Sequence, residues 1–166
     1  MGFYFSQIHM KNNIKHISWT WFVIGLIFLG IVYYFINMYT QQSNKIPQVC
    51  SLRKCFTVEL ARTPAQQELG LMNRTSMAEN SGMLFIFSKN DFYNFWMKNT
   101  RIPLDMIRID EQYTVVRILT AQPCITDPCM VYRPEKIALF VLEINAWIAA
   151  KWGIQEGMNV KFRNIE

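Results

Sequence analysis

One uninterrupted apolar block near the N-terminus dominates the hydropathy pattern of the chain. Residues 19–36 read WTWFVIGLIFLGIVYYFI, without a charged residue and with Thr20 as the only polar interruption. As an α-helix the block is about 27 Å long, close to the ~30 Å hydrocarbon core of a bilayer, so we expect these residues to contact lipid. A buried core helix would keep a polar face, and a cleaved signal peptide has a shorter apolar region before a small-residue cleavage site. The pattern therefore favours a transmembrane signal anchor.

The charges on either side of this block indicate its orientation. Lys11 and Lys15 precede it without any acidic residue, whereas residues 37–44 after it carry no charge. Positive charge resists translocation, so the N-terminus is predicted to stay in the cytoplasm while the remainder of a single-pass cell-membrane protein is exported. The expected organisation is a cytoplasmic tail (1–18), a signal anchor (19–39), a linker (40–54) and an extracytoplasmic domain (55–166).

Beyond the anchor, the pattern changes to short segments typical of strands and tight turns. Alternating or continuous apolar positions predict strands at residues 56–61, 83–87, 92–97, 104–109, 113–119, 138–144 and 160–162. Thr63, directly before a proline and three residues before a glutamine, starts a capping-box helix that Gly70 ends. Asn145 is expected to cap a second short helix at 146–152, and the proline-rich residues 122–135 are expected to form a loop. Such elements predict an α+β, mainly β, domain.

The cysteines form two pairs, Cys50 with Cys55 and Cys124 with Cys129, and each pair has four intervening residues. In an oxidising compartment an even number of cysteines indicates disulfides, although four cysteines allow three connectivities. We favour the two local bridges, because an aspartate–proline turn inside the second pair can bring its sulfurs together. The alternatives are a four-cysteine zinc site, which more often uses two-residue spacers, and free or redox-active thiols, for which a C-x-x-C motif is absent.

Charge and composition exclude several classes of function. From Lys45 onward, fifteen basic and twelve acidic residues are scattered without a run, so nucleic acid is not expected as a partner. The two histidines, His9 and His16, both precede the apolar block, which argues against histidine-based hydrolases and metal sites in the exported part. A phosphate-binding glycine loop is also absent. We therefore expect no cofactor and no metal, and we favour a non-enzymatic role.

Several motifs of the exported part resemble those of the domain-of-unknown-function 192 family. They are GLM-x-R at residues 70–74, GMLF-x-F at 82–87, FWMKNT-x-IPLDM at 95–106, LE at 142–143 and GI-x-x-G at 153–157. The resemblance implies a compact α+β domain with a strongly curved or barrel-like sheet and two short helices, without an agreed activity. The chain departs from the family pattern at Met158, where an aspartate is usual, and at Trp147, where a glycine is usual.

The polar residues around the central motif are the best candidates for a ligand site. Around a turn stiffened by Pro103, the motif offers a cation, an amide, a hydroxyl and a carboxylate beside a flat aromatic face. Such a set suits a neutral or zwitterionic ligand held by stacking and directed hydrogen bonds. The candidate residues are Trp96, Lys98, Asn99, Thr100 and Asp105, to which Glu143 and Arg74 could be added from neighbouring segments.

The same residues also fit a purely structural role. Asn and Thr beside a proline turn commonly bond their own backbone, and Lys98 with Asp105 can form an ion pair across a hairpin. Asp105 and Glu143 could instead form an acid/base pair of the kind that glycosidases use. The leading interpretation is a membrane-anchored binding or envelope-assembly module for a small polar ligand, glycan, peptide or envelope protein. The alternatives are a histidine-independent carboxylate hydrolase of envelope glycans and a structural envelope protein.

Overall fold

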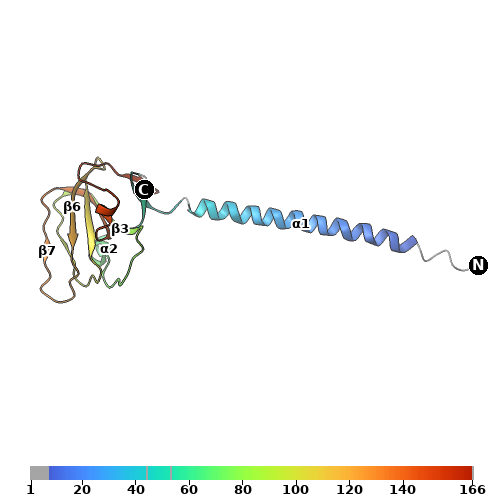
Figure 1. Cartoon of the computed structure of the whole chain (residues 1–166), viewed down its shortest axis with the longest axis horizontal. Coiled ribbons are helices and arrows are strands. Elements are labelled where there is room, and N and C mark those ends of the chain that lie inside the picture. Colours follow the sequence, from blue (N-terminus) through green and yellow to red (C-terminus); the bar gives the residue numbers. More distant parts are fainter. Residues whose placement is uncertain (1–7, 44, 53, 166) are drawn as a thin grey trace, which may run out of the picture. The chain divides into compact units, whose positions relative to one another are not determined.

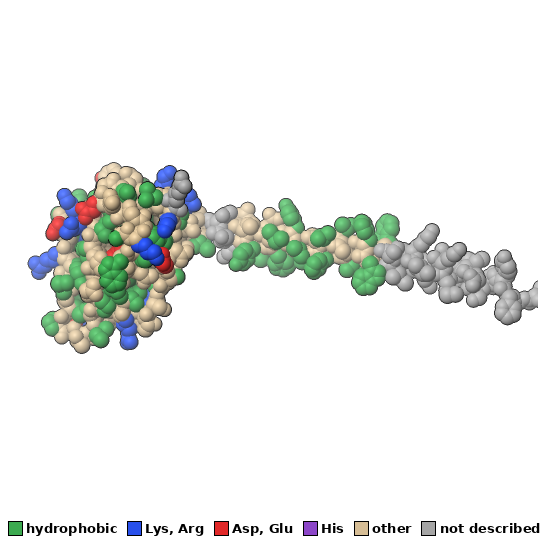
Figure 2. All heavy atoms as spheres, in the orientation of Figure 1, with side chains coloured by type: hydrophobic (Ala, Val, Ile, Leu, Met, Phe, Trp, Pro, Cys, Tyr) green, Lys and Arg blue, Asp and Glu red, His purple; other side chains and the backbone are tan. Residues whose placement is uncertain are grey.

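The computed structural model describes residues 8–43, 45–52 and 54–165, and the chain divides into two units, Met1–Lys45 and Ile46–Glu166. The first unit contains one helix, α1 (Ile8–Ser43), shown in Figure 1. Its stretch Trp19–Gln41 has a mean hydropathy of 2.0 and no buried residues, so it is long and apolar enough to cross a membrane. Figure 2 shows apolar side chains along this stretch. Of the expected cytoplasmic tail, residues 1–7 lie outside the described residues, and α1 begins within the remainder.

The second unit is built on one curled, half-barrel sheet of seven strands. In spatial order these are β6 (Val115–Ala121), β5 (Leu104–Ile109), β8 (Ala138–Asn145), β3 (Ser81–Asp91), β2 (Lys54–Ala61), β1 (Gln48–Ser51) and β9 (Lys161–Arg163). All neighbours are antiparallel except β2 and β3, which are parallel. This arrangement confirms the expected mainly β fold with a curved sheet.

The remaining elements cover the sheet. They are α2 (Pro64–Leu69), α3 (Ile148–Lys151) and a separate two-stranded sheet of β4 (Phe95–Trp96) with β7 (Val131–Tyr132). The short helix α2 begins as expected, because the Thr63 hydroxyl accepts the backbone N–H of Gln66 while the Gln66 side chain accepts that of Thr63. The helix ends at Gly70, whose φ of 47° lies in the left-handed region.

Both faces of the central strands are buried, in two separate apolar clusters. All six residues of β5 are buried, and side chains that alternate along a strand enter different clusters. Ile107, together with Leu142 of β8, belongs to the cluster that we call the first core. Met106, together with Val141 of β8, belongs to the cluster that we call the second core. The face to which a polar residue of β5 or β8 points therefore decides what it can contact.

Several expected boundaries differ from the observed ones. Residues 48–51 of the expected linker form β1, because they pair with both β2 and β9 and are mostly buried. The expected strand at 92–97 is reduced to β4, and the expected loop at 122–135 contains β7. Asn145 is not a helix cap: its side-chain amide donates to the carbonyls of Met77 and Ala78, 2.9 and 3.1 Å away, and α3 begins after Trp147.

Candidate functional site

A pocket opens on the second-core side of the sheet, beside α2. Its walls come from α2 and the turn that follows it, from β3, from residues 93–96, and from Lys98, Thr100 and Glu143. Its volume is about 200 Å³. A more open depression of about 420 Å³ adjoins it, and the two share the lining residues Glu68, Leu69, Met72, Trp96 and Lys98. We call the first the α2 pocket and the second the adjoining depression.

Glu143 contributes a nearly buried carboxylate to the α2 pocket. In the register of the sheet it lies between Met83 of β3 and Met106 of β5, and it is only 4% exposed. Within the described part of the chain, no hydrogen bond or ion pair reaches its carboxylate. Burial raises the pKa of Glu143 to about 8, because the charged form loses its hydration. Near neutral pH this side chain is therefore mostly a neutral carboxylic acid.

A glycine of the GMLF motif places β3 closely against this part of β8. A Cβ atom at Gly82 would lie 2.5 Å from the carbonyl oxygen of Glu143, a distance that no side chain tolerates. The motif glycine is therefore required by the close approach of the two backbones. The Gln67 side chain, which also lines the α2 pocket, donates to the carbonyl of Ile86, 2.9 Å away, and so attaches α2 to β3.

Aromatic side chains form much of the remaining wall of the α2 pocket. The Phe87 and Tyr93 rings are stacked, with centroids 3.6 Å apart, and Phe95 meets Phe85 edge to face at 5.1 Å. Trp96 lies at the rim and is 43% exposed, so its ring is not part of the core. The ring faces of these side chains offer apolar contact and a negative quadrupole to any ligand that enters.

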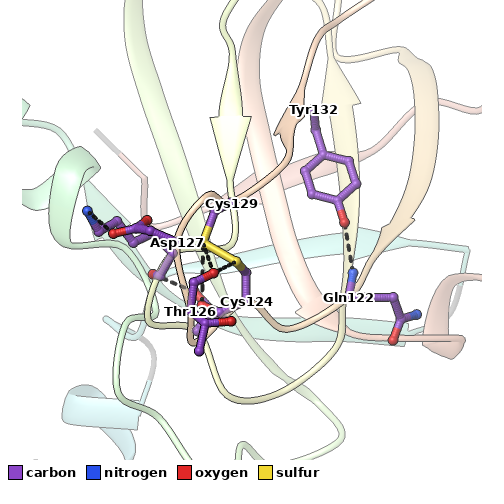
Figure 3. Close-up of a disulfide and its surroundings, with 8 residues drawn as sticks. Gln122, Cys124, Thr126, Asp127, Cys129 and Tyr132 are labelled. Atoms are coloured by element: carbon purple, nitrogen blue, oxygen red, sulfur yellow. Dashed lines mark hydrogen bonds and ion pairs between the residues drawn. A yellow bond between two sulfur atoms is a disulfide. The ribbon is translucent and has the colours of Figure 1, made fainter.

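Lys98 lies at the rim with two contacts that hold its ammonium group. Its Nζ is 5.3 Å from the centroid of the Trp96 ring and 3.4 Å from a carboxylate oxygen of Asp127. Figure 3 shows Asp127 on the loop that the Cys124–Cys129 disulfide closes. Lys98 also pairs with Cys124 through an isolated β-bridge. The expected ion pair between Lys98 and Asp105 is therefore not formed, and a disulfide loop positions this cation instead.

Thr100 and Asn99 have different surroundings, although they are adjacent. Thr100 is buried in the wall of the α2 pocket, whereas Asn99 lines only the adjoining depression. Asn99 has a φ of 56°, and its carbonyl accepts the backbone N–H of Asn73, itself at a φ of 63°. Asparagine tolerates this left-handed conformation better than most residues, so Asn99 is explained in part by the turn. Arg74 lines neither pocket and pairs with Glu59.

Asp105 is separated from the α2 pocket by the sheet. It pairs in register with Ile144, a residue of the first core, and is 2% exposed. Its carboxylate accepts the Thr120 hydroxyl at 2.7 Å and the backbone N–H of Ala149 at 3.0 Å. These bonds connect β5 to β6 and to α3. Asp105 therefore has a structural role in the sheet, and the alternative acid/base pair with Glu143 is not formed, since the two carboxylates lie on opposite faces.

Sequence reasoning missed two charged residues near the pocket. Glu68 lines both the α2 pocket and the adjoining depression, but its helix is too short for sequence periodicity to show its direction. Arg108 is fully buried behind the Phe95 ring, with its guanidinium carbon 5.5 Å from the ring centroid. One of its nitrogens donates to the Tyr93 carbonyl at 2.9 Å, while Nε and Nη1 have no partner among the described residues. Burial lowers the pKa of Arg108.

The four cysteines form two local disulfides, Cys50–Cys55 and Cys124–Cys129, as expected. Cys50 and Cys55 are direct cross-strand partners in the hairpin of β1 and β2. Because their sulfurs are bonded in pairs, the four cysteines do not form the alternative zinc site.

Comparisons with other proteins agree with this architecture. The profile of the DUF192 family, described as an uncharacterised ACR, matches residues 47–162, and the chain therefore belongs to this family. A crystal structure from Sinorhizobium meliloti, provisionally described as a transcription regulator, is 33% identical with a TM-score of 0.64, over 70% of this chain and 91% of that one. A protein of unknown function from Novosphingobium aromaticivorans is 37% identical with a TM-score of 0.61, over 70% and 83%. Comparison with curated proteins gives no match.

Proposed function

We propose that this protein is a membrane-anchored ligand-binding module, in which α1 holds the domain at the extracytoplasmic surface and the α2 pocket receives a small polar ligand or part of a peptide or glycan. The observation that carries the proposal is the Glu143 carboxyl group, which faces a pocket while lacking a partner among the described residues. A buried polar group without a partner destabilises a fold, so its presence in a concave site supports a binding role.

The apolar helix and the disulfides support the location in this proposal. The Trp19–Gln41 stretch has the length of a membrane span, and lysines precede it without acidic residues. Two disulfides in one small domain are typical of an oxidising compartment outside the cytoplasm.

The geometry favours binding over the hydrolase alternative. A two-carboxylate mechanism needs both groups on either side of one substrate bond, and Asp105 lies on the other face of the sheet from Glu143. The structural alternative accounts for Asp105 and Asn99 but not for the unpaired Glu143. Nucleic acid is not an expected ligand, because basic and acidic side chains are interspersed on the face of the domain that Figure 2 shows.

The proposal is tested with the full-length chain in detergent micelles, screened against glycan fragments and short peptides by saturation-transfer NMR. Trp96→Ala removes the exposed aromatic wall at the rim and is expected to weaken the binding of any selected ligand at least tenfold. The matched control is Trp147→Ala, since Trp147 is also exposed but lines neither the α2 pocket nor the adjoining depression. Equal affinities of the two variants, or the absence of any ligand from the whole screen, would contradict the proposal.

A further inference from the structure

We infer that the α2 pocket selects a primary alkylammonium group, the chemistry of a lysine-like side chain, and that Glu143 is its counter-ion. This inference rests on the proposed function and names the class of ligand. It combines three independent features of the pocket: an unpaired carboxyl group, a wall of aromatic rings and a volume suited to a side chain.

The first feature is the state of the Glu143 carboxyl group. The residue is more than nine-tenths buried and lines the pocket, yet the described residues supply it with neither a cation nor a hydrogen-bond donor. Its register neighbours on both sides, Met83 and Met106, cannot serve as partners. A ligand ammonium group would supply both a charge and up to three donors to this carboxylate.

The second feature is the aromatic wall formed by Phe85, Phe87, Tyr93, Phe95 and Trp96. Aromatic ring faces attract cations through their quadrupoles, and cages of such rings are a known means of ammonium recognition. Two of these rings already contact cations of the chain itself, since Lys98 lies 5.3 Å from the Trp96 centroid and Arg108 lies 5.5 Å from that of Phe95. The faces of these two rings therefore already attract cations.

The third feature is size. The α2 pocket, at about 200 Å³, falls below the roughly 300–1,000 Å³ typical of sites that enclose a whole small molecule. It can enclose an alkyl chain with a terminal amine, while the larger adjoining depression receives the backbone of the same ligand. A peptide that carries a primary amine on a flexible side chain meets both requirements.

The charged groups around Glu143 are compatible with this inference. Glu68 on α2 adds negative charge at the mouth, and Tyr93 contributes its ring to the wall. Lys98 is the cation nearest the rim, but its ammonium group is paired with Asp127 rather than with Glu143. Arg108 lies against the Phe95 ring and donates to the Tyr93 carbonyl, and among the described residues no ion pair joins it to Glu143, although both residues lie on the same face of the sheet.

The raised pKa of Glu143 gives the inference a distinctive consequence. The free carboxyl group is mostly protonated at pH 7, and an ammonium ligand binds best to the carboxylate. Binding should therefore release about one proton per ligand at pH 7, and little or none at pH 9, where the carboxyl group is already ionised. A neutral ligand that accepts a hydrogen bond from the acid would release no proton.

The experiment is isothermal titration of the full-length chain in detergent with Nα-acetyl-lysine amide, in two buffers of different ionisation enthalpy. The neutral comparison is Nα,Nε-diacetyl-lysine amide, and 1,5-diaminopentane tests whether a free polyamine suffices without a peptide backbone. We expect the lysine amide to bind at least tenfold more tightly than the diacetyl compound, with proton release at pH 7 that disappears at pH 9. Tighter binding of the diamine than of the lysine amide would show that the preferred ligand is a free polyamine, which carries the same primary alkylammonium group.

Glu143→Gln keeps the shape of the side chain and is expected to lose both the selectivity for the amine and the proton release. The matched control is Glu111→Gln, which removes one carboxylate from an exposed turn outside the pocket and should behave as the wild type. Equal binding of the acetylated compound, or unchanged titrations with Glu143→Gln, would overturn the inference. If only neutral glycans or peptides bind, and do so through Trp96, the proposed function stands and the ammonium inference fails. If no compound binds, both fail.

Discussion

The side chains of Asp105 and Glu143 point to opposite faces of the sheet, although β5 and β8 are adjacent strands. Asp105 is the register partner of Ile144, and Glu143 is the partner of Met106, so the two carboxylates are one position out of phase. Asp105 therefore enters the first core, where protein groups satisfy it, while Glu143 lines a pocket on the second-core side. Two acidic residues with similar burial thus have different surroundings.

Asp105→Asn is expected to destabilise the domain and leave the pocket intact. The amide can accept only through one oxygen, so with the Ala149 N–H on that oxygen its NH₂ group faces the Thr120 hydroxyl, which can accept only one of the two amide N–H groups. Leaving a buried group unpaired in this way costs about 1–3 kcal/mol. Thermal melts of the full-length chain measure the loss, with Asp91→Asn, at a half-exposed side chain, as the control. An unshifted melt, or a loss of ligand binding without destabilisation, would return Asp105 to the candidate site.

The stability of the domain is expected to fall with rising pH because of Glu143. Its pKa is raised from 4.5 to about 8, so the folded state retains a proton that the unfolded state releases. The part of the free energy of unfolding that comes from this retained proton is fully present below about pH 4.5. It is lost progressively as the pH rises through the folded-state pKa, by up to about 1.4 kcal/mol per pH unit. Glu143→Gln should remove this part of the slope, whereas Glu111→Gln should retain it. Parallel curves for wild type and Glu143→Gln between pH 5 and 8, measured by urea unfolding, would exclude a raised pKa.

Arg108→Met is expected to leave stability unchanged or to raise it by up to about 3 kcal/mol. The substitution removes two buried nitrogens and a charge for which the described residues supply neither partner nor counter-ion, at the expense of one bond to the Tyr93 carbonyl. A buried methionine on the same strand provides the contrast, since Met106→Ala should cost about 2–5 kcal/mol through the cavity that it leaves. Differential scanning calorimetry compares the two variants. A large destabilisation by Arg108→Met would reveal a partner for the guanidinium group.

The two disulfides are expected to differ in their effect on the pocket. Each closes a short loop, with a sequence separation of 5, so each should contribute less than the ~3 kcal/mol that loop-closure entropy gives for a fifteen-residue loop. Replacing Cys124 and Cys129 by Ser releases the loop that carries Asp127 and should alter the environment of Lys98. The same change at Cys50 and Cys55 should not, because strand pairing holds that hairpin. Mass mapping of the unreduced protein comes first, and a bridge between the two pairs would contradict the assignment.

The domain is expected to be outside the cytoplasm. Protease added to intact spheroplasts should digest the chain from Lys45 onward, because the lysines before the apolar helix resist translocation. Lysed spheroplasts and a cytoplasmic marker protein provide the controls for access and integrity. Complete protection of the C-terminal fragment in intact spheroplasts would reverse the orientation.

Local patterns in the sequence indicated most of the elements of this protein and favoured the observed pairing of its cysteines. The apolar block specifies a helix by its length alone, and the Thr63 capping box specifies where α2 begins, because both depend on neighbouring residues. The cysteine spacing likewise favoured two bridges that close over short loops. Trp96, Lys98 and Thr100 stand close together in the central motif, and all three line one pocket.

Only the tertiary structure decided which of the remaining candidates share that pocket. β8 lies between β5 and β3, which are distant from it along the chain, and the register with both strands sets the face of Glu143. A register shift of one residue in β8 would have turned Glu143 to the first-core side and Ile144 to the second-core side. The local sequence does not predict which of these registers forms, because residues on both faces of β8 are buried. The pairing of Lys98 with Asp127 likewise depends on a loop that returns from another part of the sheet. Contacts between distant segments, rather than local preferences, therefore place Glu143 in the α2 pocket and Asp105 in the first core.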